Sequence, residues 1–370
     1  YEINIGDWSS DVCSSDLALA GFFGMSSKFV EVILAFKYRT SKEGGELFSG
    51  PFQYIKYGLQ EAGFKKIGIY LAVIYAIFLM LSSVFGAIPF QANQTVTLII
   101  GNFDWLSQNS WIAGLVLCSI TGLVIIGGID RIASVAASLM PIMTITYFVS
   151  CIVIIIFNID KLGWSLHVIF DGMMNGAAAS GGAVGAMVAG IRRAMFANEA
   201  GMGTAAIAHA VTKDEEPVRA GFVAMLEPCF DTIIICFMTG IIIVISGAYT
   251  SEQTGVLMTS LAFESVSSWF PILLKIITPL FAFSTIITYC YYCEIAWLYL
   301  FNQKTLTYFR FFILVSIYFA SVSKDLISIA SIGDTLFMCS AVINMIALVF
   351  LSNVVSKEVN IYLKKRSSNK

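Results

Sequence analysis

Long apolar stretches, each about as long as a bilayer-crossing helix, recur along the chain between short polar loops. A helix needs about 20 mostly apolar residues to cross the hydrocarbon core of a membrane. The pattern predicts nine such helices, the second of them broken near Pro89. They cover residues 18–37, 67–100, 111–128, 137–157, 166–191, 219–246, 269–300, 307–323 and 326–352. The stretch 255–268 is too short and mixed to cross, and is expected at the surface or as a short packed helix.

Composition supports this reading. Hydrophobic residues make up 58% of the 370 and charged residues only 12%, whereas soluble domains carry about 25% charge. The excess apolar surface must face lipid, so the sequence predicts an all-α polytopic membrane protein. The net charge of −2 argues against nucleic-acid binding, which uses clustered basic residues. The cysteines are scattered, and we expect them to be buried as small apolar residues. Cys290 and Cys293 have the spacing of a zinc-binding pair but lack the further ligands of a zinc site.

The basic residues predict an orientation. If the first helix runs inward, eighteen of the 22 Lys and Arg fall on one side of the membrane, and only Lys161 and Lys324 on the other. Cytoplasmic loops carry the excess of Lys and Arg. This predicts a multi-pass protein of the cell (inner) membrane with a cytoplasmic C-terminus and a basic tail over 353–370. Residues 1–17 are polar, foreign to the pattern and unlike a signal peptide.

Polar residues interrupt the second apolar run. Three amides and a hydroxyl, among them Gln91 and Asn93, lie within residues 91–95, just after Pro89. Unpaired amides in lipid cost several kcal/mol, so these side chains must face the bundle or a wet cavity. Transporters bind substrate at helices interrupted by Gly or Pro. The pattern predicts a site lining; interhelical hydrogen bonding is the alternative.

A glycine-rich stretch, residues 172–190, forms the second interruption. Small residues recur at a spacing of four, which is typical of closely packed membrane helices. The adjacent Gly181 and Gly182 lower helix propensity by about 2 kcal/mol relative to two Ala. We therefore expect a packed helix with an unwound centre; close packing alone is the alternative.

Charges inside the apolar runs are few. Lys28 and Glu31 lie three residues apart on one helical face and are expected to pair. Glu227 and Asp231, four apart, indicate either gating or structural pairing with a cytoplasmic Arg or Lys. Glu294, near a helix end, is expected to anchor the structure.

Two adjacent hydroxyls, Ser284 and Thr285, lie in the middle of the seventh predicted helix. Hydroxyl and carbonyl oxygens suit a hard monovalent cation because they replace its hydration oxygens without adding charge. The alternative is hydrogen bonding to the carbonyl four residues earlier in the same helix.

Several segments in order carry a family resemblance. They include GMSSKFVEVILAFKYR (24–39), PFQANQT (89–95), IRRAMFANEAGMGTAAIAHA (191–210), PVRAGFVAMLEPCFDTIIICFMTG (217–240) and FSTIITYCYYCE (283–294). Over residues 18 to 352 the chain resembles the alanine or glycine:cation symporters, the sodium:alanine symporter family. The NEAGMG segment followed by AHA is the most specific match.

The resemblance implies a leucine-transporter-like fold, in which two five-helix repeats of inverted topology each begin with a broken helix. Residues 158–352 would form repeat two, with its broken helix at Gly181-Gly182. Residues 18–157 would supply four helices of repeat one, whose first broken helix is missing.

The resemblance also implies a substrate site and a sodium site. The expected substrate-binding residues are Gln91, Asn93, Gly181, Gly182, Gly185, Thr285 and Tyr289. Ser284 and Thr285 are the expected cation ligands. Tyr289 stands where the family usually has Trp, which affects the size of the side chain that the pocket accepts.

The expected function is sodium-coupled symport of a small neutral amino acid, alanine or glycine, into the cell. Sodium is the coupling ion; no other cofactor and no obligate protein partner is expected. We do not expect an enzyme, because the chain offers no paired nucleophile and base. Its two histidines, His167 and His209, lie near opposite faces of the membrane. The alternatives are a channel-like or non-transporting membrane protein, and a proton-coupled amino-acid transporter.

Overall fold

In the residues that it describes, the computed structural model has helices and one pair of short strands, in which β1 (Thr40–Ser41) pairs antiparallel with β2 (Leu47–Phe48). It describes residues 11–41, 47–100, 105–106, 109–174, 195, 197–212, 216–251, 256–301, 303–323 and 327–368. The chain forms two compact units, each described here by itself. The first comprises Tyr1–Ser26, Met143–Ala200 and Met225–Ile277; the second comprises Ser27–Ile142, Gly201–Ala224 and Thr278–Lys370.

Six helices in the described part are long and apolar enough to cross a membrane. They are Lys65–Ile100, Gly128–Phe157, Pro217–Ser246, Pro271–Leu300, Gln303–Val322 and Ser331–Ser368. Each coincides with one of the predicted helices, which confirms a polytopic membrane protein. The predicted span 111–128 matches a shorter apolar helix, Ser110–Ile125, and the span 18–37 lies within α1 (Asp11–Lys37).

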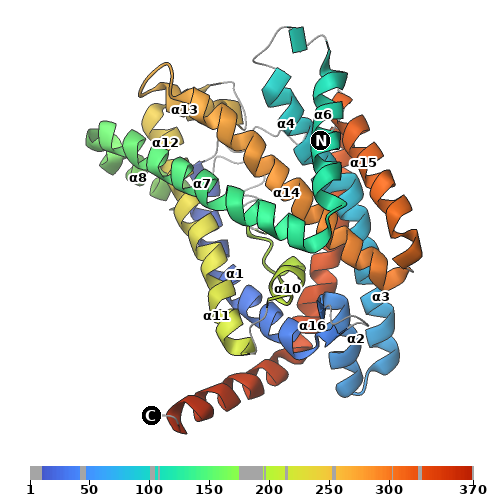
Figure 1. The fold of residues 1–370 in the computed structure, drawn as a ribbon. Helices are drawn as coiled ribbons and strands as arrows, with labels where there is room; N and C mark the ends of the chain where they lie inside the picture. The colour runs from blue at the N-terminus through green and yellow to red at the C-terminus, as the bar shows by residue number, and fades with distance from the viewer. Residues whose placement is uncertain are drawn as a thin grey trace. The chain divides into compact units, whose positions relative to one another are not determined.

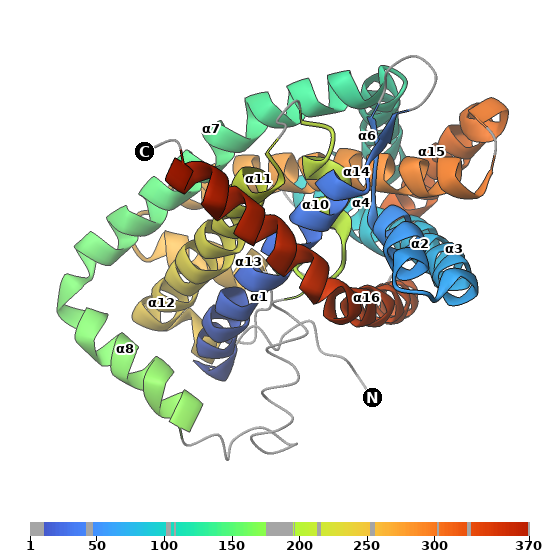
Figure 2. The ribbon, with the colours of Figure 1, turned by 90° about the horizontal axis from the view of Figure 1, so that it is seen from below.

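The second unit is a bundle of apolar helices. It includes α2 (Pro51–Glu61), α3 (Lys65–Ser82), α4 (Ile88–Ile100), α6 (Ser110–Ile125), α10 (Thr204–His209), α15 (Leu306–Val322) and α16 (Ile327–Ser368). Helix α3 packs on α2 and α16, and α15 packs on α6 and α4. Figures 1 and 2 both show α2 and α3 side by side. Helix α16 continues to Ser368, so most of the predicted tail is helical.

The first unit has its own small apolar core. Helix α12 (Phe237–Ser246) packs against α8 (Ile159–Met174) and α13 (Val256–Glu264). Ile169 on α8 and three residues of α12, Ile241 among them, are buried there. Helix α13 confirms that the stretch 255–268 contains a short packed helix.

Three further helical segments, α7 (Gly128–Phe157), α11 (Pro217–Pro228) with its continuation, and α14 (Pro271–Leu300), are long. Helix α7 precedes α8, and α11 continues into a π-helical segment, η3 (Cys229–Cys236). Helix α14 contains Pro279 without ending there. Short 3₁₀ turns, η4 (Ala248–Thr250) and η5 (Gln303–Thr305), complete the described elements.

The predicted break near Pro89 is a π-helical turn and not an interruption. The turn η2 (Ser83–Ala87) joins α3 to α4, and the helix runs on through Pro89. Proline lacks an N–H and its ring clashes with the carbonyl four residues earlier. A wider turn accommodates the ring and keeps the backbone groups bonded inside the helix, which the bilayer requires. The polar residues that follow are therefore presented by helix and not by unwound backbone.

Two glycines let this π-turn approach α16 closely. A Cβ placed on Gly86 would lie 2.7 Å from the Cα of Gly333, and one on Gly333 would overlap Gly86 in turn. Both obstacles are backbone atoms, which cannot rotate away. The crossing therefore needs glycine on both helices, as small residues at membrane-helix interfaces generally allow.

We predict that Gly86→Ala lowers the stability of the protein by about 1–3 kcal/mol, the usual cost of overpacking. Gly163→Ala on α8 is the matched control, because a Cβ there meets nothing within 4 Å. The measurement is the thermal unfolding midpoint in detergent micelles. Equal midpoints for the two variants would contradict the close crossing.

Candidate functional site

Asn93 joins α4 to the end of α15. Its Nδ2 donates hydrogen bonds to the carbonyls of Ala320, at 3.0 Å, and Ser323, at 2.9 Å. The last carbonyls of a helix have no partner within the helix, and no water replaces one inside a bilayer. Asn93 thus makes the interhelical hydrogen bonds that the sequence offered as an alternative. Its contact with substrate stays a prediction.

Gln91 lies half-buried on the same helix. Its backbone carbonyl accepts a hydrogen bond from Thr95 Oγ1 at 2.7 Å. Among the described hydrogen bonds, none involves the Gln91 side chain. This amide therefore remains available to a ligand, unlike that of Asn93.

The hydroxyls of α14 bond to their own helix. Ser284 Oγ and Thr285 Oγ1 both donate to the carbonyl of Phe281, at 2.8 and 3.0 Å, and Thr288 Oγ1 donates to that of Ser284 at 2.9 Å. This is the back-bonding alternative. Each hydroxyl oxygen keeps lone pairs that can accept, so the arrangement remains compatible with a cation.

Tyr289 is buried one turn further along α14. Its ring meets those of Phe337 on α16 and Tyr292 edge to face, with centroids 5.6 and 5.5 Å apart. The side chain thus has a fixed place between α14 and α16. The described part also has a cavity of about 440 Å³, lined mainly by apolar and aromatic residues of α3, η2, α14 and α15 together with Thr305 of η5, but Tyr289 and Gln91 are not among its lining residues.

The remaining predicted site residues are three glycines and two carboxylates. Gly181, Gly182 and Gly185 lie outside the described residues. Glu227 and Asp231 belong to the first unit, where both side chains are exposed at the junction of α11 and η3. Their gating or structural role stays a prediction.

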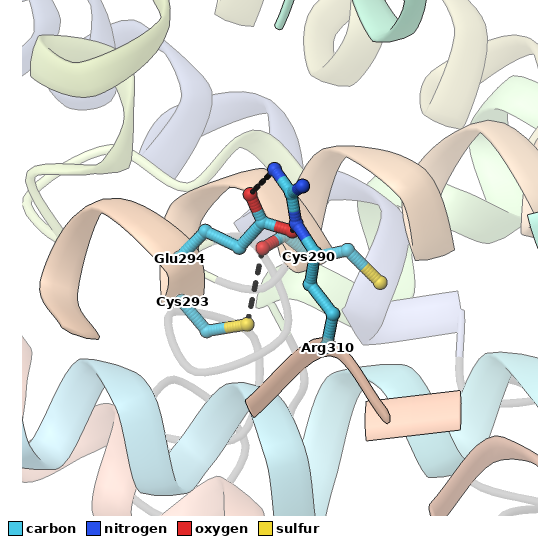
Figure 3. A network of polar contacts seen from close by, with 4 residues as sticks. All are labelled: Cys290, Cys293, Glu294 and Arg310. Carbon is cyan, nitrogen blue, oxygen red and sulfur yellow. Dashed lines mark hydrogen bonds and ion pairs between the residues drawn. The ribbon is translucent and has the colours of Figure 1, made fainter. Parts of the chain in front are cut away.

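Glu294 anchors α14 to α15, as the sequence predicted. Arg310 donates to both of its carboxylate oxygens at 2.7 Å, from Nε and from Nη2 (Figure 3). Only 5% of the Glu294 side chain is exposed. Beside this pair, Cys293 Sγ donates to the carbonyl of Cys290 at 3.1 Å (Figure 3), and both thiols are free.

A second buried carboxylate, Glu31 on α1, organises a cluster that the sequence analysis missed. Its Oε1 accepts hydrogen bonds from the backbone N–H of Gly203, at 3.1 Å, and from Asn344 Nδ2, at 2.8 Å. Lys28, also buried, interacts with it electrostatically as predicted, but is not its hydrogen-bonding partner in any described bond. The available signal was a lone amide, Asn344, in the last apolar run.

In this cluster, side chains from several helices bind three consecutive residues, 201–203. Asn344 Nδ2 also donates to the carbonyl of Gly201 at 2.9 Å, and Tyr75 OH on α3 donates to that of Met202 at 2.5 Å. Tyr54 OH on α2 donates to Asn344 Oδ1. Burial raises the pKa of Tyr54 well above its usual value, so its hydroxyl keeps its proton and donates.

Glycine is required in this segment. Gly201 and Gly203 have φ of 83° and 88°, a conformation that residues with a Cβ rarely adopt. A Cβ on Gly203 would also lie 2.8 Å from Tyr75 OH and overlap Pro51. The backbone conformation of this segment therefore requires the two glycines of the sequence GMG.

Comparison with known proteins identifies the family. The family model described as "Sodium:alanine symporter family" matches residues 17–370. The chain belongs to the sodium:alanine symporter family. It is therefore related to sodium-coupled amino-acid transporters and not to enzymes.

Individual relatives cover most of the chain. The sodium/alanine symporter AgcS of Methanococcus maripaludis is 32% identical over 95% of this chain and 77% of its own length. An uncharacterized transporter of Haemophilus influenzae is 33% identical over 95% and 76%. The probable sodium/glutamine symporter GlnT of Bacillus subtilis is 31% identical over 95% and 72%.

The cap that Asn93 forms on α15 predicts a stability effect. Asn93→Ala should cost about 1–3 kcal/mol, because the carbonyl of Ser323 loses its described donor and that of Ala320 keeps only the N–H of Ser323, at 3.3 Å. Gln91→Ala should change stability by less than about 0.5 kcal/mol, because no described bond is lost. Unfolding midpoints in micelles measure both; a similar loss for the two variants would argue against the cap.

The pair of Glu294 and Arg310 predicts a non-additive effect. Arg310→Met should cost about 3–5 kcal/mol by leaving a buried carboxylate unpaired. Adding Glu294→Met should recover most of that loss. The same unfolding assay, applied to both single variants and the double variant, measures the coupling; additive losses would contradict it.

Proposed function

We propose that the protein carries a small neutral amino acid, alanine or glycine, into the cell together with sodium. The observation that carries this proposal is the family match over residues 17–370. Relatives bear names for alanine and for glutamine symport, so substrate choice varies within the family.

The proposed architecture is the leucine-transporter-like inverted repeat. Residues 18–157 would give four helices of repeat one and residues 158–352 five of repeat two, nine in all. The six long apolar helices at predicted positions support this arrangement. Gly181, Gly182 and Gly185 would form the broken helix of repeat two.

The proposed site combines an available amide with hydroxyl oxygens. The Gln91 amide would bind the substrate, while Thr285 would line the site and share sodium with Ser284. The free lone pairs of the two hydroxyls support this assignment. The sodium charge would help hold the substrate carboxylate, so the two would bind cooperatively. Each charge moved inward gains about 2.3 kcal/mol per 100 mV of membrane potential.

The proposed orientation places the C-terminus in the cytoplasm. Lys37 bonds Glu358 at 2.7 Å, and Lys365 bonds Glu216 at 2.5 Å. Both lysines belong to the basic set that the sequence assigns to the cytoplasm, so these contacts support a common side for the end of α1 and the end of α16.

Sodium coupling is tested by uptake of labelled alanine into proteoliposomes that contain the purified protein. An inward sodium gradient should drive accumulation above the external concentration, because the gradient does the work. Uptake that is equal with choline in place of sodium would contradict sodium coupling. Uptake that only equilibrates would favour the channel-like alternative, and uptake driven by a pH gradient alone would favour proton coupling.

The role of Gln91 is tested by Gln91→Ala in the same assay. Loss of a hydrogen bond to a charged substrate group costs about 1.5–3 kcal/mol, so the half-saturating alanine concentration should rise about tenfold or more. Gln60→Ala removes an exposed amide of α2 and is the matched control. An unchanged half-saturation for Gln91→Ala would remove Gln91 from the site.

A further inference from the structure

Glu31 has one carboxylate oxygen that the structure leaves without a partner. The side chain is completely buried, and Oε1 carries both described hydrogen bonds. Oε2 is buried as well and has no hydrogen bond. Glu294, by contrast, has both oxygens bound by Arg310.

An unpartnered carboxylate oxygen in a membrane interior is costly when the group is charged. Buried charges in proteins are paired, bound to metal ions or neutralised by a proton. Ionisable residues inside membranes accordingly mark ion pathways and proton relays. The free Oε2 of Glu31 is thus a position for a positive species.

A proton fits this position better than sodium does. Hard cations take several oxygen ligands at once, whereas a proton needs a single lone pair. The neighbouring carbonyls of Gly201 and Met202 each already accept one hydrogen bond, from Asn344 and Tyr75, which leaves each of them a single lone pair.

The surrounding groups make the charge of Glu31 matter for the segment 201–203. The titratable groups of the cluster are Lys28 on α1, Tyr54 on α2 and Tyr75 on α3; α16 contributes the neutral Asn344. Hydrogen bonds to an ionised acceptor are roughly twice as strong as bonds between neutral groups. Protonation therefore weakens the bonds from Gly203 and Asn344 to Oε1.

We propose that Glu31 is a proton-binding site inside the membrane, and that its charge sets how firmly the segment 201–203 is held. The proton comes from bulk water and binds Oε2. The ionised form holds the segment directly through the N–H of Gly203 and indirectly through Asn344, which also donates to the carbonyl of Gly201, and the protonated form releases it in part.

Infrared spectroscopy of the reconstituted protein tests proton binding directly. A protonated carboxyl has a C=O stretch that the carboxylate lacks. We expect this band to appear and disappear reversibly as the pH of the sample is changed. The band should be lost in Glu31→Gln and kept in Glu294→Gln, the matched buried carboxyl. Absence of the band, or its persistence in Glu31→Gln, would overturn the proposal.

Glu31→Asp guards against a folding defect. If Glu31→Gln does not elute as a folded species on gel filtration, Glu31→Asp should keep the band at a shifted frequency. An unshifted band in Glu31→Asp would assign it to another residue and overturn the proposal.

The effect on the segment is read from transport, and this arm rests on the proposed function. Sodium-driven alanine uptake should vary with pH in the unmodified protein and lose that variation in Glu31→Gln. Unaltered pH dependence would overturn the link to the segment 201–203. If the unmodified protein shows no uptake, the proposed function fails, while the infrared band still decides the proton site.

Discussion

The bilayer offers no water to backbone or side-chain polar groups, and this constraint explains most of the polar contacts in the structure. Serine and threonine hydroxyls such as Ser284 and Thr285 bond to their own helix. The Asn93 amide caps the end of α15. The carboxylate of Glu294 has a matching guanidinium. Once these needs are met, few buried side-chain polar atoms in the described residues lack a hydrogen-bond partner, and Oε2 of Glu31 is one of four.

Those that remain are informative because they are exceptions. The side chain of Gln91 makes no described hydrogen bond and is available for a substrate. The Oε2 atom of Glu31 is buried without a partner. The two suggest separate tasks within the second unit. Gln91 would contact the cargo, and Glu31 would control a glycine segment that belongs to the most recognisable part of the sequence.

Hydropathy predicted the long helices because the length of an apolar run is a local property, set by the thickness of the membrane. The predicted break near Pro89 was wrong, because a π-turn can accommodate a proline without unwinding the helix. The hydropathy pattern could not predict the hydrogen-bonding partners of Glu31. Gly203 and Asn344 lie 172 and 313 residues away, and no periodicity within one helix points to them. Asn93 was expected in the substrate site. Its capping role could not be predicted, because it depends on where the distant helix α15 ends.

Buried side chains from separate helices hold the segment 201–203. Hydrogen–deuterium exchange of this segment in the reconstituted protein measures how firmly it is held, because a bonded and buried amide exchanges slowly. We expect slow exchange of a peptide covering residues 201–207 and much faster exchange after Asn344→Ala, which removes donors to Glu31 and Gly201 at once. Equal exchange in the two proteins would contradict it.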